Sequence, residues 1–274
     1  GGMRDVQFKK FLSPASIYFW IFAVFLYFPI FLLVILSFND SALLRFPLKG
    51  FTLDWYKTVL RSHELVGALQ NSVVVGVVSS VVSGVLGTMA AIGIVRFRFP
   101  GRNLFLAISA LPLVIPAIVI GVALLILFRS ILDVDLSLWT LGLSHVVINI
   151  PIVMLIVASR LAGMDANLEE AAMVYGCTQF QAFYKVMVPL AKPVVISVLF
   201  LSFLYGWSDF LFSNMLTTGG GPQTASIAIY IATAGGERIE WEMLAVMTLV
   251  AGVPPTVVYM MAQKYLSQTF ATAT

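Results

Sequence analysis

The chain has 274 residues, of which 60% are hydrophobic and only 11% are charged, and its mean hydropathy is +0.98. Soluble domains carry about 25% charged residues. Composition therefore excludes a soluble protein, which would lack the polar side chains to cover its surface. The net charge of +3 does not indicate nucleic-acid binding, because the basic residues are spread through loops and form no patch. The single cysteine, Cys177, excludes an intrachain disulfide.

Six apolar stretches are long enough to cross a bilayer, which takes about 20 helical residues. The second stretch is rich in Val, Ser and Gly, and small residues allow helices to pack closely in lipid, so it is expected among other helices. The sequence predicts an all-α polytopic membrane protein with six transmembrane helices. In chain order these cover residues 16–38, 67–95, 104–128, 138–161, 193–216 and 241–263.

The basic residues predict the orientation of the spans. Ten of the 16 Lys and Arg residues, but only 4 of the 13 acidic residues, lie on the side of the two termini and the loops 96–103 and 160–192. Because Lys and Arg accumulate on the cytoplasmic side, both termini are expected there. The expected parts are an N-terminal tail with the first helix and an external loop (1–66), a transmembrane core (67–263) containing a cytoplasmic loop (162–192), and a cytoplasmic tail (264–274).

The cytoplasmic loop 162–192 is polar and helix-prone, unlike the spans on either side of it. Asn167 can cap a helix whose first turn carries Glu169 and Glu170, where acids suit the helix dipole. Gly176 then ends this helix or permits a close backbone contact. From periodicity alone, the favoured interpretation is an ordinary amphipathic loop that lies on the bilayer surface.

A second short helix is expected over residues 179–186. Its apolar side chains, Phe180 among them, recur at helical spacing. Pro189 and Pro193 are expected to mark the return of the chain to the membrane.

The order of residues in this loop is specific. Glu170-Ala171-Ala172 is followed by three residues, Gly176, nine residues and then Val-Met-Val-Pro, which ends at Pro189. This order resembles the EAA loop of permease subunits of binding-protein-dependent ABC importers, with the pattern EAA-x3-G-x9-I-x-LP. Two departures are Val in place of Ile and Leu, and Tyr-Gly-Cys where the family often has Asp-Gly-Ala.

The resemblance implies the type I importer (MetI-like) permease fold over residues 67–263. It also implies that the loop forms a coupling helix, which seats in a groove of an ATPase subunit. Gly176 would then let two backbones come close. The residues assigned to ATPase coupling on this basis are Glu169, Glu170, Ala171, Ala172, Gly176, Phe180 and Pro189.

Motifs of catalysis are absent from the sequence. It contains no G-x4-G-K-[ST] phosphate loop, no H-E-x-x-H or C-x-x-C metal spacing and no G-x-S-x-G elbow. We therefore expect no catalytic residue, no metal site and no cofactor in this chain. ATP and Mg are expected in a separate ATPase subunit.

Polar residues inside spans are costly in lipid and are functional candidates by default. Asp209 and Trp207 fall in the predicted fifth span, and His145 and Asn149 share one face of the fourth. Each is a candidate for lining a substrate pathway. The alternative is a structural hydrogen bond between helices or, for Asp209, a position at the membrane interface near the outer leaflet.

The function favoured by the resemblance is the permease subunit of an ATP-driven importer in the bacterial plasma (inner) membrane. Its expected partners are a second, different permease subunit, two ATPase subunits, an extracytoplasmic solute-binding protein and membrane lipid, without nucleic acid. A membrane-embedded enzyme would show clustered catalytic groups. The alternative class, an ion-coupled secondary carrier, would show several intramembrane acids, whereas only Asp209 is clear.

The substrate prediction is divided. The stretch SFNDSALLRFPLKGFTLDWYKTVL resembles the first external loop of polyamine permeases. The stretches YGWSDFLFSNMLTTGGGPQT and WEMLAVMTLVAGVPPTVVYMMAQKYL resemble sugar and polyol permeases. A small hydrophilic solute is expected, with a sugar or polyol favoured and a polyamine as the alternative, because the fifth and sixth spans usually contribute to the pathway.

Overall fold

The computed structural model describes residues 14–41, 48–165, 167–217, 221–234 and 240–271. Within these ranges the regular structure is helical, and one isolated bridge pairs Asn39 with Phe51. The chain forms two compact units, residues 1–62 with 231–250 and residues 63–230 with 251–274. The elements are α2 (Pro14–Leu36), α3 (Asp54–Arg61), α4 (His63–Arg96), α5 (Arg102–Val114), α6 (Ala117–Ile126), the π-helical turn η1 (Leu127–Ile131), α7 (Leu138–Ala162), α8 (Asn167–Val174), α9 (Gln179–Ala182), the π-helical turn η2 (Phe183–Met187), α10 (Val188–Ser208), α11 (Leu211–Thr217), α12 (Ala225–Ala234) and α13 (Trp241–Ala271).

The predicted all-α polytopic fold is confirmed, and the predicted third span is a bent pair of helices. Among the described residues, five helical stretches are long and apolar enough to cross a membrane, and α5 with α6 and η1 forms a sixth if the pair is counted as one span. This pair bends by 102°. The bend has a local cause: a residue that precedes proline is driven out of the helical region, and Ile115, before Pro116, is extended at φ −72° and ψ 132°.

The fifth span differs from the prediction of residues 193–216. Its helical stretch covers Gln179–Ser208, Asp209 is extended, and α11 begins only at Leu211. The expected separate helix over 179–186 is instead the first part of this span. Pro189 does not interrupt it: Pro189 follows the π-helical turn η2 at the start of α10, and the helical stretch continues through it.

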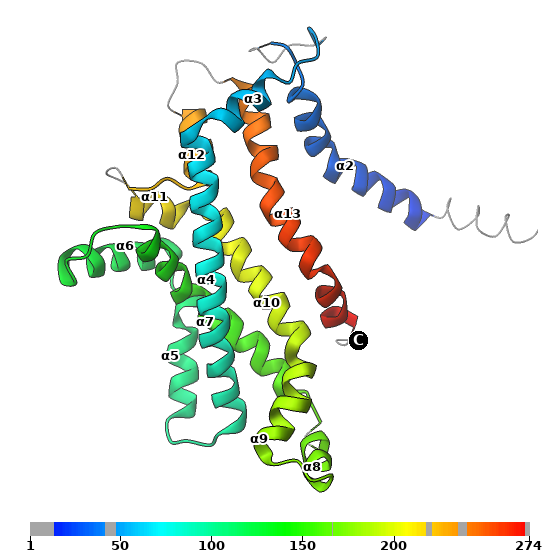
Figure 1. Cartoon of the computed structure of the whole chain (residues 1–274), viewed down its shortest axis with the longest axis vertical. Helices are drawn as coiled ribbons and strands as arrows, with labels where there is room; N and C mark the ends of the chain where they lie inside the picture. Colours follow the sequence, from blue (N-terminus) through cyan, green and yellow to red (C-terminus); the bar gives the residue numbers. More distant parts are fainter. Residues whose placement is uncertain (1–13, 42–47, 166, 218–220, 235–239, 272–274) are drawn as a thin grey trace, which may run out of the picture. The chain divides into compact units, whose positions relative to one another are not determined.

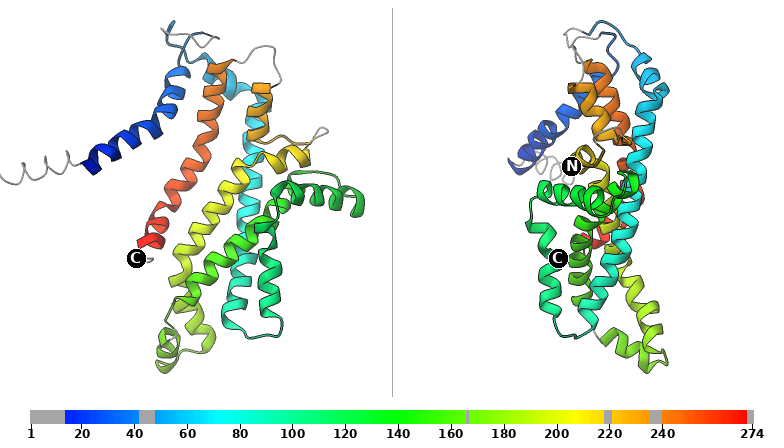
Figure 2. Two further views of the ribbon diagram at one scale, coloured as in Figure 1. Left: turned by 180° about the vertical axis from the view of Figure 1, so that it is seen from behind. Right: turned by 90° about the vertical axis from the view of Figure 1, so that its left-hand side faces the viewer.

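Helix α4 packs closely against α7 and α10 in the larger unit (Figures 1 and 2). A Cβ atom added at Gly76 would lie 2.8 Å from the Phe203 ring, and one added at Gly87 would lie 2.6 Å from Val153. The Ser80 hydroxyl donates to the Leu199 carbonyl at 2.6 Å. Small residues therefore let these backbones approach, as predicted for the second span.

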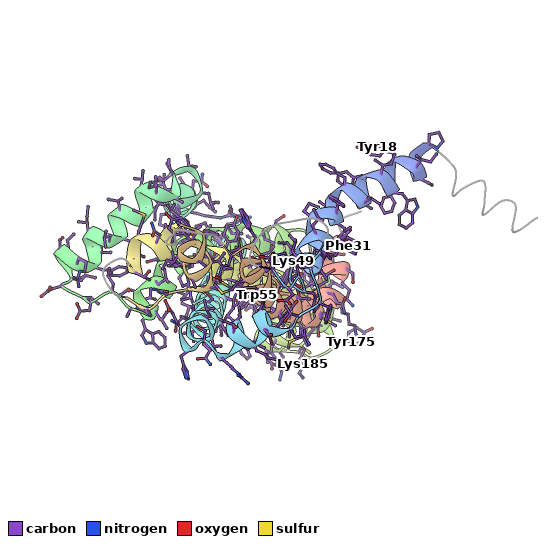
Figure 3. The ribbon with its side chains drawn as sticks, turned by 90° about the horizontal axis from the view of Figure 1, so that it is seen from above. Tyr18, Phe31, Lys49, Trp55, Tyr175 and Lys185 are labelled. Carbon is purple, nitrogen blue, oxygen red and sulfur yellow. The ribbon has the colours of Figure 1, made fainter. Side chains whose placement is uncertain are left out.

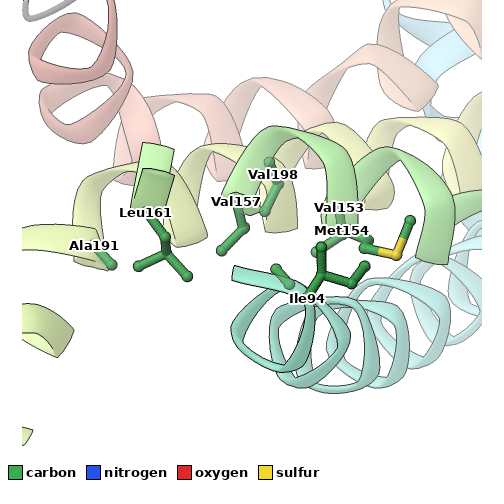
Figure 4. Packing of buried hydrophobic residues seen from close by; sticks show 8 residues of the cluster. Ile94, Val153, Met154, Val157, Leu161, Ala191 and Val198 are labelled. Atoms are coloured by element: carbon green, nitrogen blue, oxygen red, sulfur yellow. The ribbon is translucent and has the colours of Figure 1, made fainter. Parts of the chain in front are cut away.

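A cluster of buried aliphatic side chains joins the ends of three helices (Figure 4). Ile94 comes from the end of α4, Val157 and Leu161 from the end of α7, and Ala191 from the start of α10. Because α8 and α9 connect α7 to α10, this cluster fixes the two chain ends between which the polar loop is held.

In the smaller unit, Asn39 connects several segments. It is 1% exposed, its Nδ2 donates to Glu242 Oε1 at 3.1 Å, and its backbone carbonyl accepts from Trp55 Nε1 at 3.0 Å. Helix α2 buries none of its side chains against the described residues, and Tyr18 and Phe31 project from it in Figure 3. Such an apolar surface requires lipid or another protein to cover it.

Candidate functional site

Gly176 ends α8 through its backbone conformation. Its φ is +91°, its N–H donates to the Met173 carbonyl at 3.0 Å, and the Cys177 N–H donates to the Ala172 carbonyl at 3.0 Å. These two bonds are those of a Schellman motif, whose left-handed position favours glycine. Apart from Gly176 itself and its two neighbours in the chain, no described atom lies within 4 Å of the position of an added Cβ. Within this chain, Gly176 is therefore required for its positive φ and not for a close packing contact.

The chain turns from α8 into the fifth span within a few residues. The Thr178 hydroxyl accepts from the Gln181 N–H at 3.3 Å, and the Gln181 side chain accepts from the Thr178 N–H at 3.1 Å. This capping box starts the helical stretch that continues to Ser208. The loop is therefore continuous with a helix long enough to span the membrane.

The loop 163–187 presents apolar side chains to its surroundings, and we call these the loop surface. Tyr175 is 90% exposed and Phe180 is 76% exposed, and Tyr175 and Lys185 are marked in Figure 3. Exposed apolar groups flanked by polar ones mark protein–protein or membrane contact sites. The loop surface consists of Leu168, Met173, Val174, Tyr175, Phe180 and Tyr184.

The predicted coupling residues do not share one environment. Glu170, Ala171 and Pro189 are exposed, and Ala172 is half-buried. The Glu169 side chain is only 17% exposed, because both of its carboxylate oxygens contact the guanidinium of Arg96 at the end of α4. Sequence reasoning missed Arg96, which counted only as one of the cytoplasmic charges.

His145 and Asp209 meet at the break between α10 and α11. His145 is buried, and its Nδ1 donates to the Leu141 carbonyl at 2.9 Å. Its Nε2 lies 3.3 Å from Asp209 Oδ2, although the two atoms are not aligned as a hydrogen bond. The same Oδ2 accepts from the Ser213 N–H at 3.1 Å, so Asp209 caps the start of α11. Asp209 is thus at a helix break and not inside a span, which corrects its predicted position.

Asn149 and Trp207 are packed within the chain. Asn149 is 1% exposed, and its Nδ2 donates to the Ser202 carbonyl of α10 at 3.3 Å. Trp207 is 7% exposed and stacks on Phe203, with ring centroids 6.0 Å apart. In this conformation both side chains contact protein, whereas the Asp209 side chain is 22% exposed. Across the described residues, no group of three His, Cys, Asp or Glu side chains is placed to hold a metal.

Comparisons with known proteins give a consistent family. The family described as "Binding-protein-dependent transport system inner membrane component" matches residues 83–272. The spermidine/putrescine transport system permease protein PotC of Escherichia coli (strain K12) is 33% identical over 228 residues, which cover 82% of this chain and 84% of PotC.

Two further comparisons extend this result. The trehalose transport system permease protein SugB of Mycobacterium tuberculosis is 33% identical over 179 residues, which cover 65% of each chain. Among solved structures, a chain of a bacterial ABC transporter involved in the import of the acidic polysaccharide alginate is 19% identical, with a TM-score of 0.70 and 96% of both chains covered. At this identity, the structural likeness supports the fold alone.

Proposed function

The chain belongs to the family of binding-protein-dependent transport system inner membrane components, and we propose that it is a permease subunit that forms half of the pathway of an ATP-driven importer. The geometry of the loop 163–187 carries the proposal. A short helix closed by Gly176 presents the loop surface beside the start of a potential membrane-spanning helix.

The proposed complex contains subunits that supply what this chain lacks. The sequence has no phosphate loop, so ATP and Mg would bind to two ATPase subunits that receive the loop surface. A second, different permease subunit would form the other half of the pathway. An extracytoplasmic binding protein would deliver the solute, and the complex would sit in the bacterial inner membrane. Closure of the ATPase subunits would move α8 and the helical stretch Gln179–Ser208 together.

Of the four proposed pathway residues, Asp209 is the one whose side chain can reach a solute in this conformation. Its carboxylate is partly exposed, whereas His145, Asn149 and Trp207 are buried. We therefore assign Asp209 to the pathway, and the other three to support of the helix break at which Asp209 lies.

The solute is proposed to be a small hydrophilic organic molecule. The sequence alone favoured a sugar or polyol. The similarity to PotC extends over more of this chain than the similarity to SugB does, which favours a polyamine. Uptake of labelled spermidine and of labelled trehalose is measured separately in proteoliposomes that contain the complete transporter. Only the transported class of solute should be taken up in an ATP-dependent manner.

The test of coupling uses two substitutions at Gly176. Tryptophan at φ +91° costs roughly 1–2 kcal/mol and places a bulky side chain beside Tyr175, so Gly176→Trp should lose co-purification with the ATPase subunits and lose uptake. Gly176→Asn, the control, should keep both, because Asn tolerates this backbone conformation. Normal ATPase recovery and uptake with Gly176→Trp would contradict the proposal.

A further inference from the structure

Arg96 makes contacts with both arms of the loop 163–187. It is the last residue of α4. Its Nη1 and Nη2 contact the two carboxylate oxygens of Glu169 in the first turn of α8. Its Cζ also lies 5.1 Å from the centroid of the Phe183 ring in η2, within the range of a cation–π interaction. One side chain thus joins the end of α4 to α8 and to the start of the fifth span.

The geometry of this contact makes it stronger than an ordinary surface ion pair. The planar guanidinium meets both carboxylate oxygens, which fixes orientation as well as distance. The side chains of Arg96 and Glu169 are 21% and 17% exposed, so water screens the pair only partly. A cation at the C-terminus of α4 and an acid at the N-terminus of α8 also complement the two helix dipoles.

We infer that Arg96 is a positioning residue for transport, which clamps both arms of the loop to the end of α4. The loop then moves together with α4, and with α7 and α10, which pack on α4 through contacts such as Ser80 with Leu199. The role in transport rests on the proposed function, whereas the clamp is a property of the folded chain. Glu169 accordingly belongs to the clamp, and exposed Glu170 remains free to face a partner.

The clamp can be measured without transport. Cys177 is the single cysteine and follows Gly176 at the end of α8, so a nitroxide attached there reports the mobility of α8 in the full chain in lipid nanodiscs. Arg96→Ala and Glu169→Ala should each raise the mobility of the label, and the double variant should raise it no further, because either change breaks the same pair. Arg98→Ala, at an exposed arginine two positions away, is the control and should leave the spectrum unchanged.

Two results would overturn the clamp. One is an unchanged spectrum in Arg96→Ala. The other is a double variant whose effect is the sum of the two single effects, since independent sites behave additively. Arg96→Lys should give an intermediate mobility, because a lysine keeps the charge but cannot meet both oxygens.

The transport role is measured in proteoliposomes with the complete transporter. Arg96→Ala should keep ATPase subunits bound but lower uptake per ATP hydrolysed between about twofold and thirtyfold, the range of coupling changes of this kind, while Arg98→Ala should match the wild type. Raised label mobility with unchanged uptake per ATP would overturn the role in transport. A wild-type complex without ATP-driven uptake would refute the proposed function, and the spectra of Cys177 would still decide the clamp.

Discussion

Two polar regions of this apolar chain are held in opposite ways: the loop 163–187, and the surroundings of the break between α10 and α11. In the loop 163–187, backbone contacts between near neighbours, such as those of Gly176 and Thr178, shape the structure and leave most side chains exposed. At the break between α10 and α11, His145 and Asn149 are buried and each contacts a distant segment. The first arrangement presents a surface to another molecule, and the second stabilises the interior of the bundle.

The largest expected effect tests whether the loop faces the cytoplasm. An impermeant maleimide added to intact spheroplasts should leave Cys177 unmodified, whereas inside-out vesicles stripped of ATPase should be labelled, because the Lys and Arg distribution predicts that this loop lies inside. Phe51→Cys in a Cys177→Ser background is the matched control. Phe51 is 75% exposed and lies in the predicted external loop, so the pattern should reverse. Labelling of Cys177 in spheroplasts would contradict the orientation.

The same contrast explains what the sequence could predict. The first-turn acids and the end of α8 at Gly176 depend on neighbours along the chain, so their spacing indicated the acids and gave the helix end as one of two roles for Gly176. The fifth span was placed too late, because its apolar pattern continues past Ser208. The helix ends where Asp209, which is extended, caps α11 through the Ser213 N–H and lies beside His145 of α7. Hydropathy carries no information about a contact between distant segments such as that of Asp209 with His145, and the Arg96–Glu169 pair was missed for the same reason.

Asp209 gives the next largest effect, because two contacts depend on its side chain. Asp209→Leu removes the cap on Ser213 and leaves His145 Nε2 facing an apolar group. It should lower the free energy of unfolding by about 2 kcal/mol, less than for a fully buried pair because Asp209 is 22% exposed. Asp209→Asn should cost under about 1 kcal/mol, since the amide oxygen still accepts from Ser213 and the amide keeps a polar group beside His145. Unfolding in bicelles measures both values.

Uptake by a transporter that carries Asp209→Asn also discriminates the two classes of solute, because this variant should still assemble with the other subunits. A neutral sugar or polyol should lose uptake only partly, whereas a polyamine would lose the counter-charge of its ammonium groups and should lose nearly all uptake. Equal stability of the Leu and Asn variants, together with unchanged uptake, would leave Asp209 without the capping and pathway roles assigned to it.

The smallest effect is expected at Asn149, although its side chain is more completely buried than that of Asp209. Its single bond to the Ser202 carbonyl is 3.3 Å long, and interhelical hydrogen bonds in membranes contribute only about 0.6 kcal/mol on average, since the unfolded chain in the membrane also finds partners. Asn149→Ala should therefore lower the free energy of unfolding by about 0.6 kcal/mol, less than Asp209→Leu does. Asn103→Ala makes the same chemical change at an exposed position in the first turn of α5 and should have almost no effect. If the two variants unfold alike, the α7–α10 contact does not depend on Asn149. If Asn149→Ala costs more than Asp209→Leu, the interior of the bundle depends on its polar bonds more than on the capped helix break.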